Sequence, residues 1–335
     1  MALHRLGVLK PLSFVQWLAT NRCNFRCSFC EASAGDAMPD ELSTAEAEAL
    51  IDDLAALGTR LVISGGEPLM RKDLPRLLQY AREKQVSLGL VSNGYLVPSL
   101  WPLLREIPWF LFFTSLDGPR EYHDKQRALD SFDRVIQALD LFGGQGVPLR
   151  IVNTVVHRDN IAMLPALHES LRASRATRWH LTPVAPLGRN EAGTFGLDAA
   201  DLERLGAFLR DAAGTDGPRV VFGESHSYLG PLLGFDGDKP FFCGAGLTRC
   251  SILADGTVLG CQQAYDRRLS EGNVKDQPLS LIWRRGFSRF RPRALPPNCA
   301  SCQQARSCAG GCWAEMERYG RCLKAMLAPT PCGKG

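Results

Sequence analysis

Residues 23–30 read CNFRCSFC, and the three cysteines of this stretch, Cys23, Cys27 and Cys30, decide how the chain is interpreted. Three thiolates on one short loop can hold a metal centre and leave one coordination position open. An iron–sulfur cluster normally takes four cysteines, so a cluster held by three has one iron free to bind another molecule. An open position separates a reactive metal site from a structural one. A zinc knuckle or a redox CxxC pair is the alternative, but the residues that follow offer no usual fourth ligand.

Short apolar runs alternate with amphipathic helical patterns from residue 12 to about 213. Buried, β-branched runs of this kind are typical of a parallel sheet that is covered on both faces. Ser43 followed by Glu46 forms a capping box at the first helix. We therefore expect an α/β fold, a partial (β/α)6 TIM-like barrel. The predicted strands are 13–20, 60–64, 86–91, 109–115, 149–156 and 178–184, and the predicted helices are 43–57, 73–84, 98–106, 130–142, 160–173 and 198–212.

The unusual motifs fall where these strands end. Barrels of this kind place their chemistry on the loops that follow the carboxyl ends of the strands. The cysteine loop follows the first strand, and further motifs follow the second, third, fourth and sixth strands: Gly65-Gly66-Glu67-Pro68, Ser92-Asn93-Gly94, Ser115-Leu116-Asp117-Gly118-Pro119 and residues 183–189.

The character of the sequence changes after residue 220, where Gly, Pro and Cys become more frequent and helical periodicity fades. We expect a barrel domain over residues 1–220 and a small Cys-rich α+β iron–sulfur domain over 221–335. Three of the 12 cysteines lie near the N-terminus, and nine follow residue 242. Cysteines of a packed core would be scattered, so this segregation favours metal binding.

Two groups of downstream cysteines have informative spacings. Cys250 and Cys261 flank SILADGTVLG. A two-residue type I′ turn at Asp255-Gly256 would place Cys250 directly opposite Cys261, with both thiols within reach of one metal centre. A cross-strand disulfide would satisfy the same geometry. The second group is separated by two, five and three residues and comprises Cys299, Cys302, Cys308 and Cys312.

Composition excludes several classes of function. A net charge of +4 over 335 residues gives no sign of general nucleic-acid binding. No apolar run approaches the roughly 20 residues that are needed to cross a bilayer. Lys10 and Pro11 interrupt the apolar N-terminal stretch, and no small-residue cleavage site follows. We therefore expect a cytoplasmic protein with no nucleic-acid or membrane partner.

The spacing of Cys23, Cys27 and Cys30 resembles the signature of the radical SAM enzymes. In that family the three cysteines carry a [4Fe–4S] cluster whose fourth iron binds the amino and carboxylate groups of S-adenosylmethionine (SAM). The resemblance implies that Phe29 lies against the adenine. It also implies that the motif Gly65, Gly66 and Glu67 binds the amino group of the SAM methionine.

Further SAM contacts are implied on the other loops. Ser115 and Asp117 match family positions near the ribose, and Arg127 matches an arginine that faces the SAM carboxylate. Ala128 stands where relatives usually carry a glycine. Asn153 is a further polar candidate, for which a hydrogen-bonded core position is the alternative.

The downstream cysteines resemble the SPASM extension of radical SAM peptide and protein maturases. The resemblance implies two auxiliary [4Fe–4S] clusters, and hence three clusters in all. Cys332 is the favoured last ligand because it resembles the closing region of the family, and Cys322 is the alternative. Two zinc sites are the structural alternative for all eight cysteines. The implied ligand sets are Cys243, Cys250, Cys261 and Cys312 for the first cluster, and Cys299, Cys302, Cys308 and Cys332 for the second.

The resemblance implies reductive cleavage of SAM to a 5′-deoxyadenosyl radical, which takes a hydrogen atom from the substrate. Our first hypothesis is a maturase that installs an oxidative modification, such as a thioether or a C–C crosslink, in a ribosomally made peptide or protein. A low-potential donor such as flavodoxin or ferredoxin would supply the electron. Only 22 residues precede Cys23, so either a separate leader-binding protein presents the peptide or the barrel recognises it.

Three other functions stay open. The second hypothesis is oxidation of a small molecule such as a tetrapyrrole side chain. Sulfatase maturation is disfavoured because Gln262 stands where those relatives carry an aspartate base. The last hypothesis is a non-catalytic iron–sulfur electron carrier or scaffold.

Overall fold

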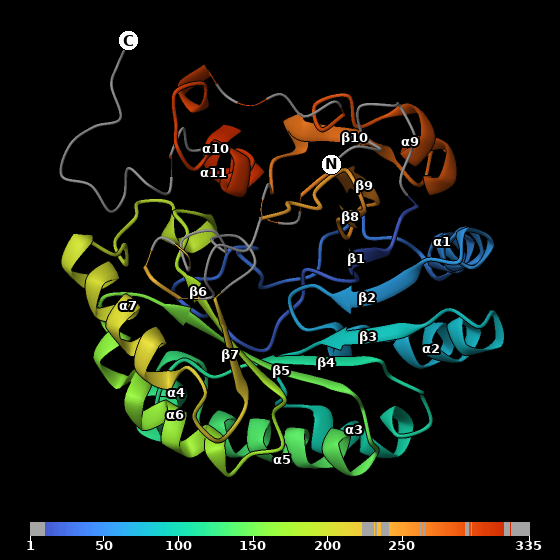
Figure 1. Ribbon diagram of the computed structural model, residues 1–335. Helices are drawn as coiled ribbons and strands as arrows, with labels where there is room; N and C mark the ends of the chain where they lie inside the picture. Colours follow the sequence, from blue (N-terminus) through green and yellow to red (C-terminus); the bar gives the residue numbers. More distant parts are fainter. Residues whose placement is uncertain are drawn as a thin grey trace.

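The computed structural model describes residues 11–222, 231, 233–235, 241–261, 263, 265–291, 295, 297–317 and 322. Within this part of the chain, one curved sheet has the strand order β10-β9-β8-β1-β2-β3-β4-β5-β6-β7 (Figure 1). Neighbouring strands from β1 to β7 are parallel. The strands are β1 (Phe14–Leu18), β2 (Arg60–Ser64), β3 (Leu88–Val91), β4 (Leu111–Ser115), β5 (Leu149–Val156), β6 (Arg178–Pro183), β7 (Arg219–Phe222), β8 (Arg249–Ile252), β9 (Thr257–Leu259) and β10 (Ser270–Asn273).

Helices follow the parallel strands along the outside of the sheet (Figure 1). The six predicted helices are confirmed, with ends within four residues of the expected ones. They are α1 (Thr44–Leu57), α2 (Leu74–Glu83), α3 (Val97–Leu104), α5 (Ser131–Gly144), α6 (Leu164–Arg172) and α7 (Ala199–Ala212). The predicted capping box is present, since Ser43 Oγ accepts the N–H of Glu46 at 3.3 Å and the Glu46 carboxylate accepts the N–H of Ser43 at 2.7 Å.

Several short elements have no counterpart in the prediction. Helix α4 (Arg120–Gln126) is almost entirely polar, so it shows no apolar periodicity. The others are α9 (Leu279–Arg285), α10 (Ala305–Cys308), α11 (Trp313–Glu317) and the 3₁₀ turns Pro68–Met70, Ile161–Met163, Gly188–Asn190, Arg267–Leu269 and Pro297–Cys299.

Strand β7 extends the barrel beyond the six predicted strands. It is only four residues long and begins directly after the turn-forming stretch 214–218, so its periodicity is too short to detect. On the other side of the sheet, β8 pairs in parallel with β1, with Cys250 opposite Val15. The Cys-rich segment therefore continues the sheet of the barrel.

The predicted two-residue turn at Asp255-Gly256 is wrong. Strands β8 and β9 pair Ser251 with Leu259, so their register brings Cys250 toward Gly260 and not toward Cys261. The N–H of Gly256 donates to Leu253 O at 3.0 Å, and Gly256 takes the left-handed φ of 87° that ends a three-residue loop. The Asp255 carboxylate accepts the N–H of Thr257 at 3.0 Å and stabilises this loop.

Side chains alternate between the two faces of the parallel strands. The outward-facing residues, such as Trp17, Phe112 and Trp179, are completely buried under the helices. The inward-facing residues are polar toward the carboxyl end of the sheet and line a cavity. Among the described residues, no helix is both long and apolar enough to span a membrane.

Candidate functional site

A cavity of about 450 Å³ lies along the inner face of the sheet. Strands β1 to β6 and the loops after them contribute to its lining. As expected from the sequence, the cysteine loop and the loops after β2, β3 and β4 meet there. The predicted site residues in the lining are Cys23, Cys27, Phe29, Cys30, Gly65, Gly66, Ser115, Arg127 and Asn153.

Burial favours the protonated thiol at two positions of the cysteine loop, Cys23 and Cys27. Burial raises the pKa of Cys23 to about 11, although the N–H of Phe25 donates to its sulfur at 3.4 Å. Burial also raises the pKa of Cys27, and the positive charge of Arg127 opposes this shift. A bound cation centre would supply the charge that keeps such thiols deprotonated.

The described residues contain no three His, Cys, Asp or Glu side chains that converge on a position for one metal ion. A [4Fe–4S] cluster does not require such convergence, because each cysteine binds a different iron. The loop therefore fits a cluster that spans its three thiols.

Arg189, the last residue of the 183–189 stretch that was expected at this edge without a role, holds the cysteine loop from the loop after β6. Its guanidinium donates to Cys27 O at 2.7 Å and to Ala34 O, and its backbone N–H donates to Cys30 O at 3.1 Å. Gly188, at φ 54°, approaches so closely that a Cβ would lie 2.2 Å from Cys30 O. The loop after β6, 162 residues from Cys27 at Arg189, thus fixes the cysteine loop. No local sequence pattern predicts this contact.

Gly65 and Gly66 allow two loops to pack against each other. The N–H of Gly66 donates to Thr20 O at 2.8 Å. A Cβ on Gly66 would lie 2.4 Å from Arg22 O, so only glycine permits this approach. Both glycines also line the cavity, where their backbone can face a ligand.

The Glu67 side chain does not line the cavity, which differs from the prediction that it binds the SAM ammonium. It is fully buried and accepts hydrogen bonds from the N–H of Leu69 (3.1 Å), the N–H of Asn93 (2.8 Å) and Ser92 Oγ (2.9 Å). Burial raises its pKa to about 7. Glu67 therefore joins the loops after β2 and β3.

Asp117 also lies away from the cavity, which differs from its predicted position near the ribose. It is fully buried and bound to Arg127, with 2.6 Å between Arg127 Nε and Asp117 Oδ2. Arg127 faces the cavity, with its guanidinium carbon 5.5 Å from the centre of the Phe29 ring. Asp117 thus orients Arg127 against Phe29 and the cysteine loop. Burial acts to raise the pKa of Asp117, but the positive charge of Arg127 outweighs this effect and lowers the pKa below its usual value.

His123 predicts a pH-dependent stability. It is buried, its Nδ1 accepts the N–H of Asp117 at 3.2 Å, and burial lowers its pKa to about 4. Because the unfolded chain binds this proton near pH 6.5 and the folded chain does not, stability is full above pH 6.5 and falls as the pH drops toward 4. Between pH 7.5 and 5 the contribution of His123 to stability falls by about 2 kcal/mol, while Glu67, whose pKa is raised to about 7, changes stability in the opposite direction, so the comparison with a His123 variant isolates the His123 effect.

Urea unfolding of wild type and His123→Gln at both pH values measures this loss. The variant should lose less stability than wild type by about that amount. An equal loss in the two proteins would contradict the shift of the His123 pKa.

Asn153 and Ser115 occupy the carboxyl end of the cavity on neighbouring strands, where they pair in register. Asn153 Oδ1 accepts a hydrogen bond of 2.7 Å from Thr182 Oγ1 on β6. Further lining residues were absent from the prediction because they belong to no motif. They include Glu31, Arg60, Arg178, His180, Thr182, Gln263 and Tyr265.

Four distant cysteines line a second, small cavity of about 40 Å³: Cys243, Cys250, Cys261 and Cys312. Burial raises the pKa of Cys250 to about 12 and that of Cys261 to about 11, and the charge of Cys243 contributes to the shift of Cys261. The four meet even though Cys250 and Cys261 are not a direct cross-strand pair. Phe14 and Gln263 line both cavities, so the two lie side by side.

A further group of cysteines lies around Cys308. Burial raises the pKa of Cys308 to about 11, and the charges of Cys322, Cys299 and Cys302 raise it further. Cys322 thus lies near the other three. Cys332 and Gln262 are outside the described residues.

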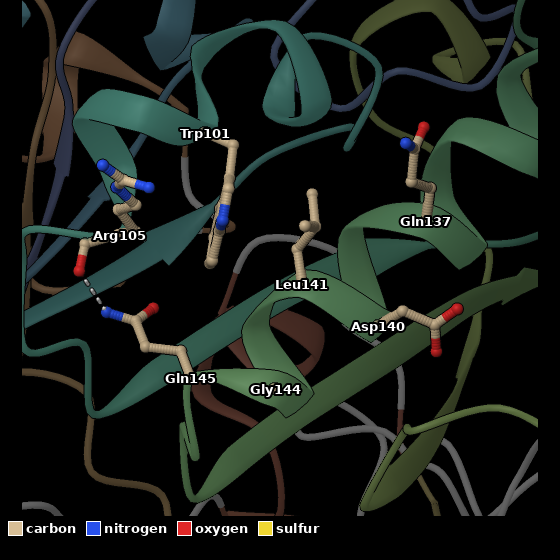
Figure 2. A pocket seen from close by; sticks show the side chains of 7 residues that line it. All are labelled: Trp101, Arg105, Gln137, Asp140, Leu141, Gly144 and Gln145. Atoms are coloured by element: carbon tan, nitrogen blue, oxygen red, sulfur yellow. Dashed lines mark hydrogen bonds between the residues drawn. The ribbon is translucent and has the colours of Figure 1, made fainter.

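A cavity of about 480 Å³ between α3 and α5 has a different character (Figure 2). Trp101 and Leu141 form its apolar part, and Gln145 donates to Arg105 O at 2.9 Å across its end. It lies on the outer, helical layer, and no cysteine or strand residue lines it. The cavity at the cysteine loop is therefore the candidate site.

Comparison with known proteins agrees with this geometry. Residues 17–171 match the radical SAM superfamily model, and residues 243–303 match the SPASM iron–sulfur cluster-binding domain. The mycofactocin maturase MftC of Mycobacterium tuberculosis is 32% identical over 311 residues, which cover 89% of this chain and 77% of that protein. The Fe-coproporphyrin III synthase of Methanosarcina barkeri is 31% identical over 338 residues, which cover 90% and 82%.

Solved structures share the fold. The crystal structure of Streptococcus suis SuiB bound to S-adenosylmethionine has a TM-score of 0.75 at 19% identity and covers 95% of this chain and 77% of SuiB. SuiB bound to precursor peptide SuiA has a TM-score of 0.74 at 18% identity, with 95% and 75% covered. The chain is a radical SAM enzyme: it belongs to the radical SAM superfamily and carries a SPASM iron–sulfur cluster-binding domain.

Proposed function

We propose that this enzyme is a maturase that takes a hydrogen atom from a peptide or protein and so starts an oxidative modification. The observation that carries the proposal is the contact between two cavities, one lined by the three-cysteine loop and one by four distant cysteines. A substrate in the larger cavity would lie between a radical-generating centre and a second redox centre. An isolated electron carrier would not need a cavity of this size beside its cluster.

The residues present fit a [4Fe–4S] cluster on Cys23, Cys27 and Cys30. When bound and reduced by a low-potential donor such as flavodoxin or ferredoxin, this cluster supplies the electron that splits SAM into methionine and a 5′-deoxyadenosyl radical. The Phe29 ring offers a face for the adenine, and Ser115 and Asn153 face the same space. Arg127, which is paired with Asp117 through its Nε, offers its remaining N–H groups to the SAM carboxylate.

We propose that the backbone of Gly65 and Gly66 binds the amino group of SAM, and that the Glu67 carboxylate does not contact it. We assign Glu67 and Asp117 as positioning residues, because neither side chain lines the cavity. We expected the barrel over residues 1–220 and the auxiliary-cluster domain over 221–335; because β7 extends the barrel sheet to Phe222, we propose that the boundary follows Phe222.

We further propose two auxiliary [4Fe–4S] clusters, on the two cysteine groups described above. The first would use Cys243, Cys250, Cys261 and Cys312, which line one cavity. For the second, we propose Cys299, Cys302, Cys308 and, because it lies near Cys308, Cys322, with Cys332 as the alternative last ligand.

Iron content tests this choice. Cys322→Ser should lower the iron of the anaerobically reconstituted protein by about four of about twelve atoms, because the second auxiliary cluster loses a ligand. Cys332→Ser is the matched control and should keep all twelve. The reverse pattern would assign the site to Cys332.

Two substrate classes have support from relatives. MftC is named as a maturase, and SuiB is solved with a precursor peptide, which favours a peptide substrate. The similarity to Fe-coproporphyrin III synthase supports a tetrapyrrole as the second candidate.

Deuterium transfer distinguishes the two classes. A perdeuterated peptide, chosen from any short reading frame found beside this gene, or a deuterated tetrapyrrole with carboxylate side chains is incubated with the reduced enzyme and SAM. The true substrate should yield 5′-deoxyadenosine that is heavier by one deuterium. Unlabelled 5′-deoxyadenosine from the peptide together with labelled product from the tetrapyrrole would replace the peptide proposal by the tetrapyrrole one.

A further inference from the structure

The main cavity runs along the whole length of the strands. At its carboxyl end lie the residues near the cysteine loop, such as Thr182 at the end of β6. Its other end is lined by Phe14, Arg60, Phe110, Leu149 and Arg178. From Arg178 to Thr182 the strand advances by roughly 13 Å. SAM contacts at the carboxyl end therefore leave the amino end for another group.

Arg178 is the first residue of β6, half-buried, and its side chain makes no hydrogen bond or ion pair within the part of the chain that the structure describes. Arg150, on the adjacent strand β5, behaves differently, since its guanidinium donates to Arg175 O at 2.6 Å and to Val147 O. A guanidinium carries five donors, and leaving them without acceptors in a partly desolvated place costs free energy. Such a side chain is suited to an acceptor that arrives with a ligand.

Other positive charges gather at the same end. Arg60, the first residue of β2, lines the cavity, with its guanidinium carbon 5.5 Å from the centre of the Phe110 ring. Arg178 pairs in register with Arg219 on β7. Like charges side by side on neighbouring strands are destabilising. Arg219 is exposed and does not line the cavity, so an anion in the cavity would meet Arg178 and Arg60.

Negative charge in the cavity lies elsewhere. Glu31, directly after Cys30 in the cysteine loop, is the acidic residue among the described residues that line the cavity. Arg127 is already neutralised by Asp117. The amino end of the cavity therefore has an excess of positive charge, flanked by apolar side chains that strengthen a charged hydrogen bond.

We propose that Arg178, assisted by Arg60, binds a carboxylate of the substrate at the amino end of the cavity. The inference rests on the proposed function and narrows its substrate class to molecules with a carboxylate on the order of 10 Å from the carbon that loses hydrogen. The planar fork of arginine binds a carboxylate through two parallel hydrogen bonds. A peptide terminus or acidic side chain and a propionate of a tetrapyrrole share this chemistry.

Binding without turnover tests the inference on reconstituted protein that is not reduced. One arm uses a pool of random hexapeptides with free C-termini, compared with C-terminal amides from which Asp and Glu are left out, by equilibrium ultrafiltration. The other uses coproporphyrin III, compared with its tetramethyl ester, by absorbance titration. At least one free acid should bind better than its neutral form, and Arg178→Gln should weaken that binding by at least about tenfold. The arm that responds identifies the source of the carboxylate.

Matched variants make the result specific. Arg178→Lys should retain part of the binding, and Arg284→Gln, an exposed arginine on α9 outside the cavity, should bind like wild type. Iron content and circular dichroism verify folding, and Arg60→Gln replaces Arg178→Gln if the latter misfolds. Equal binding of acids and neutral forms, or undiminished binding by the folded variant, would overturn the inference. Formation of 5′-deoxyadenosine by the same wild-type preparation tests the proposed function separately.

Discussion

Replacing Cys27 by alanine is expected to abolish the formation of 5′-deoxyadenosine from SAM by the reduced, reconstituted protein. Cys27 is buried at the centre of the cysteine loop, and Arg189 and Arg127 both approach it. Without its thiolate the loop retains two ligands, too few to hold a [4Fe–4S] cluster that keeps one iron open for SAM. The rate should fall by at least about a thousandfold, which corresponds to about 4 kcal/mol of activation free energy.

Ser28→Ala is the matched control in the same loop. The Ser28 hydroxyl is buried and has no hydrogen-bond partner among the described residues, so the variant should keep its activity and its iron. The measurement is 5′-deoxyadenosine by mass spectrometry, with iron counted on the same samples. Activity that survives in Cys27→Ala would place the radical-generating cluster elsewhere in the chain.

The second large effect is expected from Asp117→Ala. Asp117 is fully buried and neutralises Arg127, whose side chain is only 12% exposed. Removal of the carboxylate leaves a nearly buried guanidinium without a counter-ion. Breaking a buried pair in this way costs about 3–5 kcal/mol. We expect this loss in the free energy of unfolding, measured by urea denaturation of the holoprotein.

Two further variants separate burial from charge. Asp133 pairs with Arg120 at the surface, with both side chains more than half exposed, so Asp133→Ala should cost no more than about 1 kcal/mol. The double variant Asp117→Leu/Arg127→Met removes both charges and should recover part of the stability of Asp117→Ala. If Asp117→Ala costs as little as Asp133→Ala, the pair contributes nothing through its burial.

Local sequence signals were sufficient for the barrel and for the place of its chemistry. The capping box of Ser43 and Glu46 and the six strand–helix alternations involve neighbours in sequence, so they can be recognised without tertiary information. Because the carboxyl ends of parallel strands meet at one edge of the sheet, the cysteine loop, Gly66 and Ser115 were expected to lie together, and they line one cavity. Strand β7 was missed because four residues carry too little periodicity.

The direction of individual side chains could not be read in the same way. Glu67 and Asp117 were expected to face SAM, but donors from other loops take their carboxylates inside the fold: Ser92 and Asn93 for Glu67, and Arg127 for Asp117. The register of the β8–β9 hairpin depended on whether Gly256 ended a two- or a three-residue loop. Each of these outcomes depends on which of several possible hydrogen-bond partners a side chain or a turn takes. The sequence does not show which partner is preferred.

The sequence by itself determined the family, the cysteine loop and the alternation of strands and helices, since these follow from spacing and from short-range periodicity. Only the tertiary structure placed the Arg189 guanidinium on the carbonyls of the cysteine loop and Arg178 at the amino end of the cavity. The local sequence around these two residues predicts neither position. Their roles arise from contacts across more than 100 positions of the chain, or from the face of a strand that looks into the barrel, and folding alone decides both.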